Sequence, residues 1–225
     1  MNTQALNQID PLAKQPEQGV NGNDMSPMDP PDAYAPPAIN QVLPSNMHPF
    51  LRQFCDEHTA FMEELKNFEE AILLVQKTGF TKELDKSVRH FFHFFDADFA
   101  PHSHREEVTF FPLLKQRLMA KGEHAPITGI NPLGINKTTG PVTPIDILED
   151  DHLKAVQLAA VVLNFLGLAF RLPDEKSRLI VLDAALEQGK NLVELLRLHI
   201  FREDNIVFAL AHQLISGAEF DRMHA

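Results

Sequence analysis

One motif occurs twice in this chain, once in each half. An acid-histidine pair at 57–58 recurs at 151–152, and a second histidine follows 44 residues after His58 and 47 residues after His152. That second histidine, His102 or His199, begins the pattern His-x-x-x-Glu-acid, and a Phe stands four residues after the second acid in both copies. Chance hardly supplies two such copies in register, so we expect two similar halves.

Apolar residues recur at helical spacing along four segments that glycine and proline separate. Pro101 lies inside the second segment and predicts a kink or local break there. No segment shows the alternation of polar and apolar residues that is typical of a strand. We therefore expect an all-α protein, a four-helix bundle, with helices over about 49–78, 81–120, 144–171 and 173–216.

The first part of the chain differs in composition from the rest. Nine of the sixteen prolines fall in the first 50 residues, among Asn, Gln, Asp and Gly and with few large apolar groups. Such a segment cannot bury enough surface to offset its ordering entropy, so we expect a disordered arm that could bind a protein partner. The expected organisation is an arm over 1–46, the bundle over 47–217 and a C-terminal tail over 218–225. A long loop at 122–143 is expected to be a lid or a crossover.

Charge, cysteine content and hydropathy exclude several classes of protein. The net charge is −11 without a local basic patch, so nucleic acid is not an expected partner. The single cysteine, Cys55, allows neither an internal disulfide nor a thiolate metal cage. The N-terminus lacks the basic and apolar regions of a secretory signal, which predicts a cytoplasmic protein. The apolar stretch 155–170 is too short and too interrupted for a membrane span, which predicts a core helix and no membrane.

The repeated motif carries metal-ligand chemistry. A spacing of i, i+4 places imidazole and carboxylate on one helix face, and burying them is unfavourable unless they bind a cation or each other. Four nitrogens and two carboxylates at one level are a ligand set for two metals. Without thiolate they suit iron, manganese or zinc, and open positions would take O2, NO, peroxide or hydroxide. The candidate ligands are His58, His102, Glu106, His152, His199 and Glu203.

At these residues the chain resembles the hemerythrin-like family, also called the HHE cation-binding domain. Its pattern of one histidine on one helix and His-x-x-x-Glu-Glu ending in Phe-Pro on the next, repeated twice, is matched from about Met47 to Gly217. The resemblance implies an up-down-up-down bundle with two non-heme iron ions joined by an oxo or hydroxo bridge, with manganese or zinc as alternatives. It also implies terminal imidazoles at His58, His102, His152 and His199 and bridging carboxylates at Glu106 and Glu203.

The chain departs from the oxygen-carrying hemerythrins at two positions. They have a fifth histidine where this chain has Val156, and an Asp ligand where Asp204 is the alternative to Glu203 here. The set of four His and two Glu is more similar to bacterial members that repair nitrosative or oxidative damage to iron centres. Those members carry a cysteine-containing N-terminal domain, whereas this chain has a proline-rich arm.

The expected function is a cytoplasmic non-heme di-iron protein that binds O2 or a related small oxidant as a sensor, carrier or scavenger. One alternative is a stress protein that repairs or supplies iron centres, and another is a metal-stabilised interaction module without redox chemistry. A ferritin-like di-iron bundle needs Glu-x-x-His on two helices and is matched only at 149–152. Of the other histidines, His90 and His93 could serve near the centre, and His104 is expected to face away from His102.

Overall fold

The computed structural model describes residues 42–79, 82–123 and 142–223, and these residues form an all-α structure. Nearly all of them are helical, and none of them lies in a β-strand. The expected arm up to residue 41 and most of the expected loop, 124–141, lie outside the described residues. The end of the arm contains a short 3-10 helix, η1 (Pro44–Asn46).

The first long helix, α2 (Pro49–Thr78), has the bounds that the sequence predicts. His48 caps its start, because its Nδ1 accepts a hydrogen bond from the Phe50 N–H, and Pro49 fits the first helical turn, where no donor is needed. Gly79 ends the helix with a φ of 77°, a backbone conformation that glycine adopts without a steric penalty.

The second helical run is one continuous path with two wide turns in it. The proline ring of Pro101 conflicts with the carbonyl four residues earlier, and a π-helical turn, η2 (Phe95–Phe99), precedes it, with the Ala100 N–H bonded to the Phe95 carbonyl. The break predicted at Pro101 is therefore a π turn. The helical run ends at Gly122, which has a φ of 77°. The other parts are α3 (Lys82–Phe94), α4 (Ala100–Arg105), η3 (Glu106–Phe110) and α5 (Phe111–Lys121).

The second half of the chain begins with α6 (Pro144–Ala169). A capping box starts this helix, in which Thr143 and the Asp146 carboxylate bind each other's backbone N–H groups. Asp174 caps the next helix by accepting from the Ser177 N–H. The remaining elements are α7 (Glu175–Arg202), η4 (Glu203–Val207), α8 (Phe208–Leu214) and α9 (Gly217–Met223).

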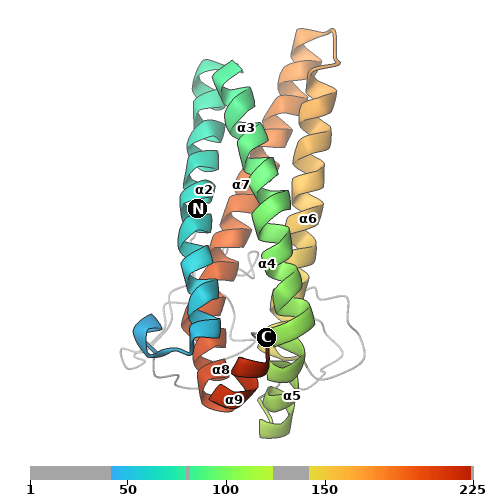
Figure 1. Cartoon of the computed structure of the whole chain (residues 1–225). Coiled ribbons are helices and arrows are strands. Elements are labelled where there is room, and N and C mark those ends of the chain that lie inside the picture. Colours follow the sequence, from blue (N-terminus) through green and yellow to red (C-terminus); the bar gives the residue numbers. More distant parts are fainter. Residues whose placement is uncertain (1–41, 80–81, 124–141, 224–225) are drawn as a thin grey trace, which may run out of the picture. The chain divides into compact units, whose positions relative to one another are not determined.

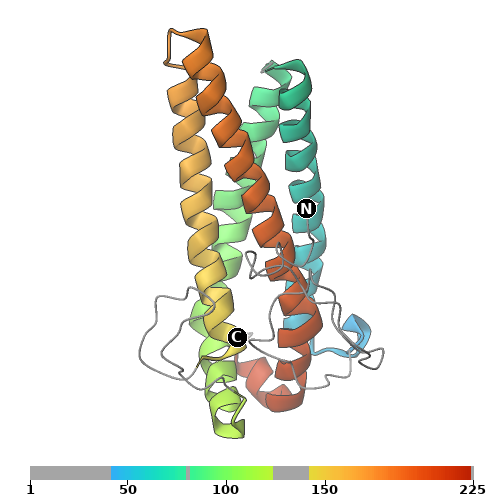
Figure 2. The ribbon, with the colours of Figure 1, turned by 180° about the vertical axis from the view of Figure 1, so that it is seen from behind.

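The long helices lie side by side along their length (Figures 1 and 2). α6 packs along α7, and α2 packs along both α7 and α3. α7 lies close to α2 at Gly189, where a Cβ would lie 2.7 Å from Ile72 Cδ1. The absence of a side chain on this buried glycine permits close packing between the two helices.

Two hydrophobic clusters fill the interior. The first contains Phe68, Phe91 and Leu192, and the second contains Phe50, Leu114 and Phe208. Along α2 and α6 the second cluster comes before the repeated motif and the first cluster follows it, and along the other two helical paths, which run from Lys82 and from Glu175, the order is reversed. A short level between the two apolar clusters therefore remains for the polar groups.

Two parts of the structure differ from the sequence expectations. The expected C-terminal tail includes helix α9, whose Phe220 is buried against Phe50 and His48. The expected core helix is α6, which is long and apolar enough to cross a membrane by length and composition alone, a weak indication. Only 33% of its apolar window is buried, so one face packs on the core and an apolar face lies outside.

Candidate metal centre

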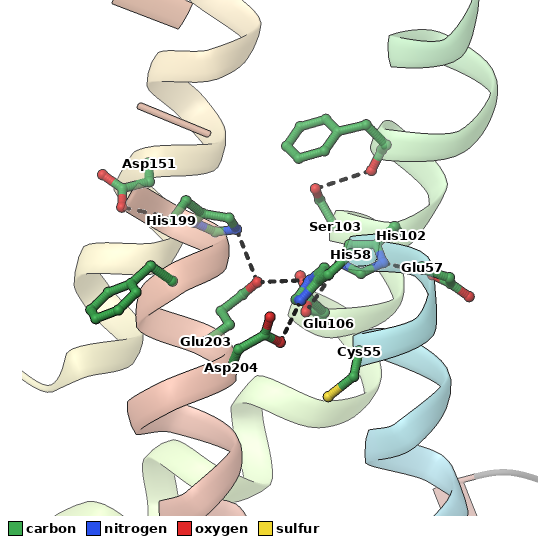
Figure 3. Close-up of polar contacts among 12 residues, drawn as sticks. Cys55, Glu57, His58, His102, Ser103, Glu106, Asp151, His199, Glu203 and Asp204 are labelled. Carbon is green, nitrogen blue, oxygen red and sulfur yellow. Dashed lines mark hydrogen bonds and ion pairs between the residues drawn. The ribbon is translucent and has the colours of Figure 1, made fainter. Parts of the chain in front are cut away.

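The six predicted ligand side chains meet in the interior at the level between the two apolar clusters. They come from four helical paths: α2, the α4–η3 path, α6 and the α7–η4 path. Every one of the six is buried, the most exposed being His152 at 4%. Figure 3 shows His58, His102, Glu106, His199 and Glu203 pointing toward one another.

The six side chains form two groups of possible donors, each with two imidazoles and two carboxylates. His58 and His102 belong to one group, and His152 and His199 belong to the other. Glu106 and Glu203 belong to both, and within each group all donor atoms lie within 4.8 Å of one another. Each of these buried His/Glu groups could therefore hold a metal ion, and two ions would share both carboxylates.

The distances between donor atoms fit a metal ion. The Nε2 atoms are 3.1 Å apart between His58 and His102 and 3.0 Å apart between His152 and His199. Two donors at right angles around one ion, each about 2.1 Å from it, would be about 3.0 Å apart. The imidazole pairs thus have the separation that ligation by one ion requires.

The two oxygens of the Glu106 carboxylate face different donor groups. Its Oε1 lies 3.4 Å from His102 Nε2 and its Oε2 lies 3.5 Å from His152 Nε2. Glu203 places Oε2 3.2 Å from His58 Nε2 and 3.3 Å from His199 Nε2. None of the four carboxylate oxygens has a hydrogen-bond partner among the described residues. Fully buried carboxylates in this state are costly, and a cation between them would remove that cost.

A π turn begins at each of these glutamates. η3 starts at Glu106 and η4 starts at Glu203, and in both turns the sixth residue donates its N–H to the glutamate carbonyl. In the first half Pro112 follows the turn, but the corresponding residue of the second half is Ala209, so proline is not the common cause. The common feature is the carboxylate at the centre, and π turns inside helices often occur at functional sites.

A second set of carboxylates holds the outer nitrogens of the imidazoles. His102 Nδ1 lies 2.6 Å from Glu57 Oε2, and His58 Nδ1 lies 2.8 Å from Asp204 Oδ1 (Figure 3). Such a contact fixes the ring orientation and directs Nε2 to the centre. Asp204, the predicted alternative ligand, therefore lies on the outer side of His58 and not between the donors.

A third imidazole repeats this arrangement, because His152 Nδ1 lies 2.9 Å from Glu107 Oε1. His199 Nδ1 lies 3.8 Å from Asp151 Oδ2, too far for a hydrogen bond, and has no hydrogen-bond partner among the described residues. Glu57 and Asp151 occupy the same place in the two copies of the motif, as do Glu107 and Asp204, but the sequence did not predict that any of them contacts an imidazole. Asp151 is buried and paired with Arg202.

Aromatic rings enclose the imidazoles. Phe208 stacks on His58 with ring centroids 5.6 Å apart, and Phe111 stacks on His152 at 5.9 Å. These two residues are the Phe of the repeated motif, and both are fully buried. They exclude water from the polar level and provide a low-polarity wall for it.

Burial and the neighbouring carboxylates change the proton affinity of the centre. Burial lowers the pKa of His58, but the hydrogen bond to Asp204 and the ion pair with Glu203 outweigh it and raise the pKa to about 10. For His152, burial is outweighed by contacts with Glu106, and the pKa rises to about 9. Burial raises the pKa of Glu106, but His102 and His152 hold it well below its usual range. Without a metal ion, protons on the imidazoles therefore supply the positive charge that faces the two glutamate carboxylates.

Several candidate residues lie away from the donors. His90 is exposed and pairs with Glu64, and His93 is also exposed, so neither borders the donor groups. His104 is exposed and faces away from His102, as its angular position predicts. Glu149 contacts Lys115 and belongs to neither donor group, which contradicts the ferritin-like alternative.

Cys55 is partly buried one turn before His58 (Figure 3). Burial and the nearby Asp204 raise the pKa of its thiol to about 12, so the thiol stays protonated and poorly nucleophilic. It is therefore a partly buried packing group.

Comparisons with protein-family models, with curated proteins and with solved structures return no match for this chain.

Proposed function

We propose that this chain is a hemerythrin-like protein, an up-down-up-down four-helix bundle that holds two non-heme iron ions and binds O2 or a related small oxidant. The observation that carries it is the pair of four-donor groups that share Glu106 and Glu203. Imidazole and carboxylate donors without thiolate suit iron, with manganese and zinc as competing ions. Two ions that share bridging carboxylates and have two imidazoles each keep positions open for a small ligand.

The residues of this chain would perform three tasks at such a centre. Glu57 and Asp204 hold the outer N–H of two imidazoles, so that the Nε2 lone pairs point at the metal positions. Phe111 and Phe208 keep bulk water away from the polar level. Bound ferrous iron would supply electrons for a small oxidant, and the dry surroundings would limit competing hydrolysis and proton leakage.

The first test is metal loading. Protein loaded with ferrous iron without air is expected to bind two iron ions per chain, measured by elemental analysis. Glu203→Ala should lose this two-ion stoichiometry, because it removes a donor from both groups. Glu194→Ala, an exposed carboxylate nine residues earlier on α7, is the matched control and should retain two ions. Retention of two ions by Glu203→Ala would contradict the shared-carboxylate centre.

The second test separates the roles. The visible spectrum of the iron-loaded protein is recorded before exposure to O2, after exposure and after purging with inert gas. A band that disappears on purging supports a carrier or sensor, and a band that persists supports scavenging or iron-centre repair. A fold that takes zinc equally well and shows no oxygen-dependent band would replace both with a metal-stabilised interaction module.

A further inference from the structure

A surface pocket of about 430 Å³ reaches one side of the candidate metal centre. It lies between α4 with η3 on one side and α6 on the other, and His152 forms part of its lining. The side chains of Ala100, Ser103 and Val156 line it as well. His152 is 4% exposed, whereas the three other candidate imidazoles are each 1% exposed. The donor group that contains His152 and His199 is therefore the one that this pocket connects with solvent.

The repeat explains why the pocket opens on this side. Ser103 follows His102 by one residue, and Ile200 holds the same place after His199. Ile200 is larger than Ser103 and is buried in the first apolar cluster. Two residues before the histidine, Ala100 corresponds to Arg197, whose Nη2 binds Glu69 Oε2 at 2.7 Å. At two positions of the pocket lining, Ala100 and Ser103, the first half thus has a small residue where the second half has a large one.

The pocket has a charge that suits a cation. Glu107 and Glu149 line it, and Glu107 continues inward to His152 Nδ1. Lys115 Nζ lies 3.3 Å from Glu149, but it is closer to Asp146, at 2.7 Å. Carboxylates along a path concentrate cations near it and raise their rate of entry. Glu106 Oε2, a buried oxygen of a carboxylate that both donor groups share, lies 3.5 Å from the Nε2 of the same His152.

We propose that this pocket is the entrance through which divalent cations reach the metal centre, with His152 as the first ligand they meet. The proposal rests on the proposed function, since it needs a centre that binds metal. It adds that the two donor groups fill through the His152 side and that Val156, Ser103 and Glu149 control the rate of entry.

The experiment measures cobalt(II) uptake by the metal-free full chain, by stopped-flow absorbance. Val156→Trp places a large ring at the pocket from a position that is 52% exposed, so the fold should tolerate it. Met62→Trp is the matched control: Met62 stands four residues after His58, as Val156 does after His152, and is 40% exposed. We expect uptake about ten-fold slower in Val156→Trp and about the wild-type rate in Met62→Trp.

A charge variant and the final stoichiometry complete the design. Glu149→Gln should slow uptake at low salt and lose this effect at high salt, because the entry effect is electrostatic. All variants should reach the same final content of two cobalt ions, with unchanged circular dichroism. A wild-type uptake rate in Val156→Trp, or equal slowing of uptake in Val156→Trp and Met62→Trp, would overturn the proposal that this pocket is the entrance. Failure of the wild-type chain to bind cobalt at all would overturn the proposed metal centre itself.

Discussion

Metal binding should release protons from the centre in a number that the structure predicts. The pKa of His58 is about 10 and that of His152 about 9, so both imidazoles carry a proton on Nε2 at pH 7. A cation that binds Nε2 must displace this proton, while Nδ1 keeps its hydrogen bond to Asp204 or Glu107. Displacement at pH 7 costs about 4 kcal/mol at His58 and about 3 kcal/mol at His152, from about 1.4 kcal/mol per pKa unit.

The assay is calorimetric titration of the metal-free protein with zinc(II) in two buffers of different ionisation enthalpy. We expect at least two protons released per fully loaded chain at pH 7, because the pKa of His102 is raised as well, its contacts with Glu106 and Glu57 outweighing burial. The product of the two apparent binding constants should rise about 100-fold per pH unit between pH 7 and 8. Release of fewer than one proton, or an affinity that does not change between pH 7 and 9, would refute this proton-for-metal exchange.

Three further outcomes follow from the same contacts. The raised pKa of His58 stabilises the metal-free fold fully below about pH 6.5, and this stabilisation is lost as the pH rises to about 10. The lowered pKa of Glu106 stabilises the fold above about pH 4.5, and this stabilisation is lost as the pH falls. Urea unfolding at pH 3, 6 and 10 should therefore show the highest stability at pH 6. Asp204→Asn should weaken zinc binding about 10- to 100-fold without loss of stoichiometry, and an unchanged affinity in a competition assay with a chelator would contradict the orienting role. Gly189→Val should lower the free energy of unfolding by about 1–3 kcal/mol because of the contact with α2, while Gly167→Val, where no atom lies within 4 Å of the added Cβ, should not; equal losses would show that the close approach to Ile72 is not the cause.

The sequence predicts those parts of the fold that local signals determine. Pro49 and Gly79 delimit α2, and Asp146 marks the start of α6, because proline, glycine and capping residues act on the backbone next to them. Helix α9 was not predicted, because its place depends on Phe220 packing against the start of α2. The outward apolar face of α6 was missed for a similar reason, since hydropathy does not tell which partner covers a helix.

The six candidate donors could be predicted from sequence because i, i+4 spacing is a local pattern and because the motif occurs in both halves of the chain. The orienting carboxylates were not found, because their partners lie far away in the chain: Asp204 contacts an imidazole 146 residues earlier. The acid before the first histidine and the acid after the glutamate are nevertheless present in both copies of the motif. A comparison of the two copies position by position, and not of the ligands alone, was the signal that could have identified them.

The direction of these contacts shows that neither half can build a metal position alone. Glu57 serves His102 within its own half, but Asp204 reaches from the second half to His58. Glu107 reaches in the opposite direction, from the first half to His152. Each donor group therefore takes one orienting carboxylate and one shared glutamate from the other half. Because the ring orientations depend on both halves, correct donor geometry requires that the two halves are already packed together, which couples formation of the centre to formation of the whole fold.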